Sequence, residues 1–364
     1  MLAYNLPAMT VTVRSFAKVN LGLRIGRLRQ DGFHELLTVY QTIAWHDLIR
    51  LSLERGRGIE IRCEDERVPK NEANTCWRVV EKAMHTLRAK GRVRIDIQKR
   101  LPVQGGLGGA SGNGVATLLA LERALKKRLS AAQRLAIAAE VGSDLPLFLV
   151  GGTVLGVGRG EQVYPLPDFP ATACVVVMPD VGVSTAKAFG QWDRRMAPGL
   201  KLHPTGGADA APKSYPATLD EPSFVVEERA SPLRPPILTS SHGSDRMVEL
   251  SREFSAWLSE RTSGAPSRRG RAENPLLALV RAGIKNDFEH VVFPEYPELS
   301  EVKSGLERVG ASYASLSGSG SALYGLFESK QAAAAAVKKL TRQAWRAQAT
   351  ASLTRRQYWS RIFE

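Results

Sequence analysis

Hydrophobic and polar residues alternate in two segments of the chain, at residues 19–25 and 93–97. This alternation is the period of a β-strand with one buried face. In the first segment Lys18 falls on the same face as Asn20. The second segment leads directly into a glycine-rich stretch. We therefore predict a half-buried strand at each segment, the second followed by a loop.

Helical spacing appears beyond the glycine-rich stretch, where apolar residues recur every three or four positions between 115 and 125. Ser130 and Gln133 then match a capping box, in which each side chain bonds the other residue's backbone N–H. A second helix is predicted to begin there. Gly142 is well placed to end it, because glycine favours the position after a helix.

Further elements are predicted in the last half of the chain. An apolar run at residues 173–178 indicates a buried strand. Near the C-terminus the pattern predicts, in order, a helix at 299–309, a strand at 312–316, a Ser-Gly-Ser-Gly-Ser turn, a strand at 322–327 and a helix at 330–342. This order fits helices packed on one face of an antiparallel sheet.

The composition changes between about residues 203 and 271, which are rich in proline, serine, glycine and charged residues. This composition is typical of an insertion outside the packed core. Within it, only residues 246–258 have the pattern of an amphipathic helix.

Size and composition allow two domains. The chain has 364 residues and a mass of 39.7 kDa, and 43% of its residues are hydrophobic. Such a chain can fill the cores of two domains that share a cleft. We expect domains at 10–165 and 172–364, the second one carrying the insertion at about 203–271.

The net charge of +14 and the pI of about 9.9 suit either nucleic acid or small anionic ligands. The basic residues are spread along the chain, and the densest runs, at 126–128, 268–271 and 355–356, lack the interleaved aromatic residues that stack on bases. We expect small anions such as nucleotides as partners, and no nucleic acid.

Three cysteines are far apart and form no C-x-x-C pair, so we interpret them as reduced core thiols. No apolar stretch approaches the length that spans a bilayer, and the N-terminal residues lack a secretory pattern. We expect a cytoplasmic protein without membrane attachment.

The strongest chemical signal is the segment PVQGGLGGASGNG at residues 102–114, between the second predicted strand and the helix after it. Its glycines let backbone N–H groups approach a polyphosphate, and the following helix adds its positive N-terminal end. The alternative is a flexible surface turn. The segment is neither a Walker A loop nor a G-x-G-x-x-G fingerprint.

Two ionisable residues are candidates for chemistry. Asp144 stands alone in the apolar segment VGSDLPLF, where it is either a general base or the N-cap of a helix. Lys18 is either an ordinary solvated lysine or a fixed ammonium that stabilises charge on a transferring phosphoryl group.

Two shorter segments are candidates for binding. In DGFHEL, residues 31–36, Phe33 offers a stacking face and His34 a hydrogen-bonding ring, although both would also suit a core and its rim. In LSGSGSALYG, residues 316–325, a second loop of small residues either approaches phosphates or turns a hairpin.

In this order, the segments resemble the GHMP kinase superfamily over most of the chain. The resemblance leaves out only about residues 203–271. It rests on FAKVNLGLRIGRLRQDGFHEL, NEANTCW, IDIQKRLPVQGGLGGASGNG, VGSDLPLFLVGGT, PDVGVSTAKAF, NDFE and LSGSGSALYGLF.

The resemblance implies a two-domain α/β (α+β) fold. An N-terminal mixed α/β domain and a C-terminal ferredoxin-like α/β domain would hold the active site in the cleft between them. It implies ATP as phosphoryl donor with Mg²⁺. It also implies transfer to the 2-hydroxyl of a cytidine diphosphate-linked methylerythritol, in the non-mevalonate isoprenoid pathway. Transfer through a loose transition state needs positioning and charge neutralisation, which suits these residues.

The resemblance also assigns roles by position. Asp144 would be the general base and Lys18 its partner, and Lys18 and Asn20 would position the hydroxyl and the γ-phosphate. Phe33 and Phe189 would sandwich the cytosine, and His34 would bond its edge. Thr185 and Asp287 are further candidates near the substrate. The residues expected to bind ATP are Pro102, Val103, Gln104, Gly105, Gly106, Leu107, Gly108, Gly109, Ala110, Ser111 and Gly112 of the loop, with Asn74 and Lys99.

The chain departs from the family pattern at a few positions. Phe33 stands where tyrosine is usual, and the loop differs at Gln104, Ala110, Gly112 and Gly114. Ala110 is the critical one in this interpretation, because a Cβ forbids some backbone angles open to glycine. Other acceptors within the family (homoserine, mevalonate or a sugar) and a non-catalytic nucleotide-binding protein remain the alternatives, and a monomer and a weak homodimer are equally expected.

Overall fold

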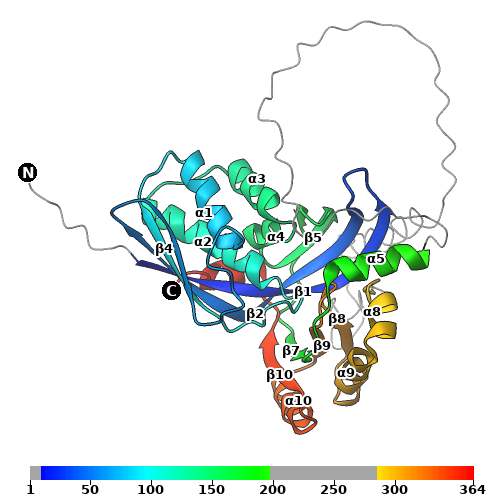
Figure 1. Cartoon of the computed structure of the whole chain (residues 1–364). Coiled ribbons are helices and arrows are strands. Elements are labelled where there is room, and N and C mark those ends of the chain that lie inside the picture. Colours follow the sequence, from blue (N-terminus) through cyan, green and yellow to red (C-terminus); the bar gives the residue numbers. More distant parts are fainter. Residues whose placement is uncertain (1–9, 197–284) are drawn as a thin grey trace, which may run out of the picture.

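The structure is a computed structural model that describes residues 10–196 and 285–364, in which two α/β bodies lie side by side (Figure 1). The insertion expected at about 203–271 and the helix expected at 246–258 lie outside the described residues.

The first body contains a six-stranded sheet in the order β3-β4-β2-β5-β6, with β1 paired along β2. Its strands are β1 (Thr10–Leu28), β2 (His34–Glu54), β3 (Gly58–Cys63), β4 (Arg92–Gln98), β5 (Thr153–Gly158) and β6 (Gln162–Pro165). Its helices are α1 (Thr75–Thr86), α2 (Gly109–Leu125), α3 (Ala131–Val141) and α4 (Leu145–Val150). Figure 1 shows these four helices together on one side of the long strands β1 and β2.

The second body contains a four-stranded sheet in the order β10-β7-β9-β8, in which every pairing is antiparallel. Its strands are β7 (Ala173–Met178), β8 (Tyr313–Leu316), β9 (Leu323–Phe327) and β10 (Arg346–Ala351). Helices α5 (Thr185–Met196), α8 (Glu289–Glu295), α9 (Pro297–Arg308) and α10 (Lys330–Arg342) accompany them. The bounds of β7 and α10 are those predicted from the sequence, and the fold class is confirmed.

Strand β1 differs from the prediction of a half-buried strand. From residue 15 to residue 23 both of its faces are buried. Phe16 packs into the core of the first body, whereas Val19 and Leu21 pack with residues of the second sheet. Since both sides are covered, the polar Lys18 and Asn20 are buried as well.

The predicted order of strand, loop and helix is confirmed. Strand β4 leads into the glycine-rich loop, and α2 begins inside that loop at Gly109. The capping box of Ser130 and Gln133 opens α3. Gly142 is the C-cap of α3, but its φ of 178° is extended, not left-handed.

An apolar cluster joins the two bodies. It combines Val19 and Val39 of the first sheet with Val176 and Leu326 of the second, and Leu107 of the glycine-rich loop belongs to it. The end of the chain returns to the first body, where α11 (Arg355–Arg361) inserts Tyr358 into the core. The glycine-rich loop is therefore fixed where the two bodies meet.

Candidate active site

The glycine-rich loop is held by backbone bonds from both bodies. The Lys18 N–H of β1 donates to the Leu107 carbonyl oxygen at 2.9 Å, and the Ala322 N–H of the second body donates to Gly105 O at 3.2 Å. Gly108 is the N-cap of α2 with a left-handed φ of 68°. The N–H groups of the first turn of α2 therefore face the space beside the loop, as an anion site requires.

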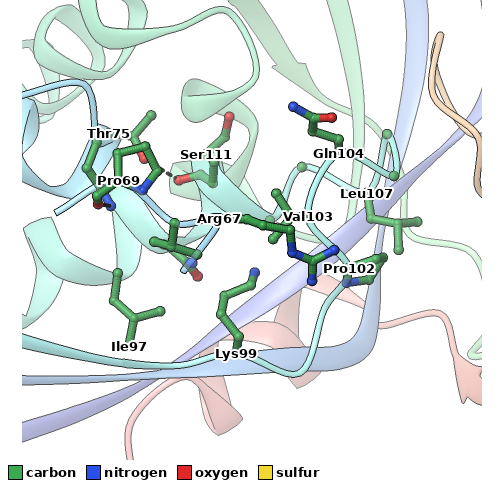
Figure 2. Close-up of a pocket in the computed structure, with 18 of the residues that line it drawn as sticks. Arg67, Pro69, Thr75, Ile97, Lys99, Pro102, Val103, Gln104, Leu107 and Ser111 are labelled. Carbon is green, nitrogen blue, oxygen red and sulfur yellow. Dashed lines mark hydrogen bonds between the residues drawn. The ribbon is translucent and has the colours of Figure 1, made fainter. Parts of the chain in front are cut away.

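A cavity of about 380 Å³ opens beside this loop (Figure 2). All ten loop residues from Pro102 to Ser111 line it, and so do Asn74 and Lys99. Gly112 does not line it. A Cβ at Gly112 would lie 2.8 Å from Ser15 Oγ, so this glycine lets α2 approach β1 closely.

Ala110 lies in the first turn of α2, outside the residues with positive φ, so its Cβ meets no backbone conflict. The non-glycine residue of the loop with a left-handed φ is Gln104, at 67°. The backbone cost that the sequence suggested for Ala110 therefore falls on Gln104.

Sequence reasoning missed several cavity residues, namely Arg67, Val68, Pro69, Ala73, Thr75, Ile97 and Asn113. Thr75 Oγ1 donates to Ala110 O at 2.7 Å and so joins α1 to the loop. Arg67 hydrogen-bonds Asp65 and lowers the pKa of that carboxyl to about 2. Asn113 is 4% exposed, and its Oδ1 has no hydrogen-bond partner. Of these residues, only Asn113 could have been inferred from the sequence, because it lies within the glycine-rich segment.

Asn74 and Lys99 have additional partners. The Asn74 side chain caps α1 by accepting from Cys76 N at 2.9 Å, and it donates to Pro69 O. Lys99 Nζ lies 2.5 Å from Asp47 Oδ2. Asp47 is fully buried, and sequence reasoning did not single it out.

Lys18 and Asp144 form an ion pair of 3.2 Å at the edge of the glycine-rich loop. Lys18 is only 3% exposed, which excludes the alternative of a solvated lysine. Its Nζ also donates to Asn20 Oδ1 at 2.8 Å, and Asn20 donates to Thr38 Oγ1. A Cβ on Gly108 would lie 2.9 Å from Lys18 Cγ, so the loop and the lysine are in direct contact.

Asp144 occupies the N-cap position of α4, but its side chain makes no capping bond. Instead Oδ1 accepts from the Tyr40 hydroxyl at 3.0 Å, while Oδ2 faces Lys18. Burial, followed by the neighbouring Asp144 carboxylate, raises the pKa of Tyr40 well above its ordinary value. The Tyr40 hydroxyl therefore stays protonated and orients the carboxylate. One third of the Asp144 side chain remains exposed, which leaves it accessible to a substrate.

The second small-residue loop both turns the β8–β9 hairpin and contacts the first loop. Ser317 Oγ donates to Gly106 O at 3.0 Å. A Cβ at Gly318 would lie 3.3 Å from Asn20 Oδ1, so this loop reaches the ion-pair cluster. Asn286 fixes the loop by donating to Leu316 O and Gly318 O.

The expected cytosine-binding residues lie near the β1–β2 turn and α5. Phe33 is 51% exposed, and the Arg159 guanidinium lies 4.9 Å from its ring centroid. His34 stacks on Phe189, with ring centroids 5.1 Å apart and an interplanar angle of 4°. Phe189 thus stacks on His34 and meets the Phe288 ring edge-on, with ring centroids 4.9 Å apart.

Polar contacts hold the rest of this region. His34 Nδ1 lies 3.2 Å from Gly26 O, and Nε2 lies 2.9 Å from Asp193 Oδ1 without the alignment of a hydrogen bond. The Thr185 and Ser319 hydroxyls are 2.7 Å apart, which joins α5 to the second small-residue loop.

Asp287 lies away from the cavity and is fully buried. It pairs with Arg24 at 3.0 Å and accepts from the Ile25 N–H at 3.0 Å. These contacts attach the segment before α8 to β1. Asp287 therefore contributes to holding the two bodies together.

A buried ammonium, a carboxylate and a glycine-rich loop at a helix N-terminus, set between two α/β bodies, define a GHMP-type small-molecule kinase. The family comparisons agree with this class. The model described as GHMP kinases N terminal domain matches residues 74–152, and that described as GHMP kinases C terminal matches residues 272–347.

Curated relatives specify the family further. The chain is 33% identical to the 4-diphosphocytidyl-2-C-methyl-D-erythritol kinase of Solibacter usitatus (strain Ellin6076), over 90% of this chain and 84% of the relative. It is 29% identical to the enzyme of that name from Geobacter sulfurreducens, over 94% and 99%. The chain belongs to the 4-diphosphocytidyl-2-C-methyl-D-erythritol kinase family of the GHMP kinases.

Solved structures agree with this assignment. A crystal structure of 4-(cytidine 5'-diphospho)-2C-methyl-D-erythritol kinase superposes with a TM-score of 0.64 at 25% identity, over 94% of this chain and 98% of that one. The homoserine kinase of Cytophaga hutchinsonii superposes with a TM-score of 0.63 at 19% identity, over 97% and 98%, and supports the fold alone. Among the described residues, no helix is long and apolar enough to cross a membrane.

Proposed function

We propose that this chain transfers the γ-phosphoryl group of ATP to the 2-hydroxyl of 4-diphosphocytidyl-2-C-methyl-D-erythritol. The observation that carries the proposal is the 3.2 Å ion pair between the buried Lys18 and the partly exposed Asp144, at the edge of the glycine-rich loop. Family membership supplies the identity of the acceptor, because the curated relatives carry the name of this kinase.

In the proposed reaction Asp144 accepts the proton of the 2-hydroxyl, whose oxygen forms a bond to the γ-phosphorus. The bond from that phosphorus to the β,γ-bridging oxygen breaks, and ADP leaves. Lys18 neutralises charge on the transferring group, and Asn20 holds the lysine in place through its 2.8 Å bond. Such a reaction depends on positioning and electrostatics more than on covalent help from the protein.

The cavity beside the loop is the proposed ATP site. The N–H groups at the start of α2 and the cations Lys99 and Arg67 all favour a polyphosphate there. The oxygen donors along it, the Ser111 hydroxyl and the unpartnered Asn113 Oδ1, suit a Mg²⁺ ion that keeps phosphate and water ligands. When bound, the ion would neutralise charge on the phosphates.

The proposed acceptor site takes its base-binding residues from the β1–β2 turn and from α5. Phe33 offers an exposed ring for stacking, and Phe189 and His34 form a second flat surface. Thr185 would contact the substrate from the start of α5. In this account the domains divide at 10–165 and 172–364, and the enzyme works in the cytoplasm as a monomer or weak homodimer.

The test is ADP release by purified protein with ATP and Mg²⁺, with four acceptors compared: 4-diphosphocytidyl-2-C-methyl-D-erythritol, homoserine, mevalonate and galactose. The proposal predicts turnover with the cytidine compound alone. Turnover with another acceptor would retain the kinase class and overturn the proposed acceptor. No turnover with any of the four would overturn the proposed activity.

A further inference from the structure

Asp47 is a fully buried carboxylate in β2 that the reaction outlined above does not use. It has three hydrogen-bond donors. Lys99 Nζ lies 2.5 Å from Oδ2, and the backbone N–H groups of Arg100 and Leu101 donate to Oδ1 at 2.7 and 2.8 Å. A buried carboxylate is costly unless its charge is paired and its oxygens are bonded, and here both conditions are met.

All three donors lie at the point where β4 passes into the glycine-rich loop. Lys99, Arg100 and Leu101 immediately precede Pro102, the first loop residue that lines the cavity. The Asp47 carboxylate therefore fixes both the backbone that enters the loop and the side chain of Lys99.

Lys99 lines the cavity beside the start of α2. A Cβ on Gly109, the first residue of α2, would lie 3.5 Å from Lys99 Nζ. Figure 2 shows the Lys99 side chain rising from the end of β4 into the cavity. An ammonium beside a helix N-terminus, which carries roughly half a positive charge, is repelled unless an anion lies nearby. Asp47 supplies that anion permanently, and a polyphosphate would supply a second.

We infer that Asp47 is a positioning residue of the nucleotide site: it holds the Lys99 ammonium beside the start of α2, so that both positive groups face the phosphates of the nucleotide. The inference deepens the proposed function, since it rests on ATP as the ligand of the cavity. It does not depend on which acceptor is phosphorylated.

The alternative is that Asp47 only clamps the backbone before the loop. The variant Asp47→Asn separates the two roles. An asparagine Oδ1 still accepts from the Arg100 and Leu101 N–H groups, but the variant loses the charge that holds Lys99. The purely structural role therefore predicts little change in nucleotide affinity, or an equal change for every nucleotide.

The experiment is calorimetric titration of the full chain with Mg²⁺-ATP and, separately, with adenosine. For Asp47→Asn we expect about 10- to 100-fold weaker ATP binding, since one charge-assisted contact contributes about 1.5–3 kcal/mol and 1.4 kcal/mol is tenfold. Adenosine, which has no phosphates, should bind within about twofold of wild type. Wild-type ATP affinity in Asp47→Asn, or an equal loss for ATP and adenosine, would overturn the inference.

The matched control is Glu122→Gln, another buried carboxylate that accepts from a backbone N–H (Leu129) and from a cation (Arg134). Glu122 does not line the cavity, so ATP affinity in this variant should stay at the wild-type value. ATP affinity that falls as far in Glu122→Gln as in Asp47→Asn would attribute the loss to the general removal of a buried charge and overturn the inference.

A pair of Lys99 variants keeps the test decisive if Asp47→Asn does not fold. Lys99→Gln alone leaves the Asp47 charge unpaired, and Asp47→Asn/Lys99→Gln removes both charges. The inference predicts equal ATP affinity for these two proteins and a higher melting temperature for the double variant. Weaker ATP binding by the double variant would mean that Asp47 affects the nucleotide site by a route other than Lys99, and would overturn the inference. These titrations need no acceptor, so their outcome is independent of the acceptor panel.

Discussion

At the scale of single residues, burial decides which of two roles each ionisable group has. From the sequence alone, Lys18 could also be a solvated lysine, and Asp144 could also be a helix cap, neither with a role in catalysis. The structure buries the lysine and turns the aspartate away from the helix N-terminus. Neither fact is visible in the sequence, because both depend on elements more than 100 residues apart.

The Tyr40 hydroxyl orients the proposed base, and its removal should lower turnover. For Tyr40→Phe we expect kcat to fall about 10- to 100-fold, since a hydrogen bond to a charged group contributes about 1.5–3 kcal/mol. The KM for ATP should stay near its wild-type value. Steady-state kinetics measures both constants.

A double-mutant cycle with Asp144→Asn distinguishes an effect of Tyr40 on kcat through Asp144 from a general structural effect. In the Asp144→Asn background, Tyr40→Phe should cause no further loss of kcat, because the tyrosine acts through the aspartate. Tyr358→Phe, which removes a hydroxyl bonded to Phe148 O, is the control and should retain kcat. Additive losses in the cycle would contradict the role given to Tyr40.

Substitution by glycine at two loop positions should change the free energy of unfolding in opposite directions. Gln104→Gly should raise the free energy of unfolding by about 0.5–1 kcal/mol, since it relieves a left-handed residue at some cost in chain entropy. Ala110→Gly should lower it by up to about 1 kcal/mol, because Ala110 is helical. Urea unfolding of both variants tests this pair. A gain in Ala110→Gly would mean that the backbone strain lies at Ala110 after all.

Residues whose role depends on three-dimensional neighbours could not be predicted. The glycines were predicted because they cluster in one segment, and Lys99 and Asn74 because the family resemblance marks their positions. Asp47 and Tyr40 lie singly in β2, where nothing in the neighbouring sequence marks them. Their importance arises from partners just after β4 and at the start of α4, which only the fold brings near.

At the scale of elements, the two small-residue loops interlock, and glycine is required where they touch. A Cβ at Gly320 would lie 2.5–2.7 Å from backbone atoms of Gly105 and Gly106. Since no flexible side chain can move aside, the loops would have to separate. The second loop is thus a support for the first as well as a hairpin turn.

Gly320→Ala should therefore weaken ATP binding and lower the melting temperature. We expect at least about a tenfold loss of ATP affinity, because forced overpacking typically costs about 1–3 kcal/mol and here displaces the phosphate loop. Calorimetric titration measures the affinity. Gly182→Ala, where an added Cβ meets nothing within 4 Å, is the control. Wild-type ATP affinity in Gly320→Ala would show that the loops are not coupled.

Local patterns predicted about half of the described elements, namely those whose signals lie in consecutive residues. Alternation marked β4, an apolar run marked β7, and the side chains of Ser130 and Gln133 marked the start of α3. The half-buried face expected for β1 was wrong at its centre, since a second sheet covers the side that would otherwise meet solvent. Burial by a distant part of the chain leaves no local signal.

At the scale of the whole molecule, a shared apolar cluster makes the two bodies one cooperative unit. Leu326 of β9 is buried in this cluster together with Val39 of β2. Leu326→Ala should lower the free energy of unfolding by about 2–5 kcal/mol, as cavity-forming substitutions do. Because the cluster is shared, thermal unfolding should remain a single transition that moves to lower temperature.

Differential scanning calorimetry checks this expectation through the ratio of calorimetric to van't Hoff enthalpy. A ratio near one in wild type and variant would agree with shared cooperativity. Two separate transitions, only one of them moved by Leu326→Ala, would contradict it. The return of α11 to the first body adds a second covalent connection between the bodies and favours the single transition.

The central claim is that Asp144 serves as the base for phosphorylation of the 2-hydroxyl of 4-diphosphocytidyl-2-C-methyl-D-erythritol. Its most direct test is phosphorus NMR of that compound incubated with Mg²⁺-ATP and either wild-type protein or Asp144→Asn. We expect a new phosphomonoester signal at the 2-position with wild type, and formation at least about 100-fold slower with the variant, since a general base contributes about 10²–10⁴ in rate. ATP binding should be nearly unchanged in the variant. Equal rates of formation in the two proteins, or a phosphate at another hydroxyl, would contradict the account.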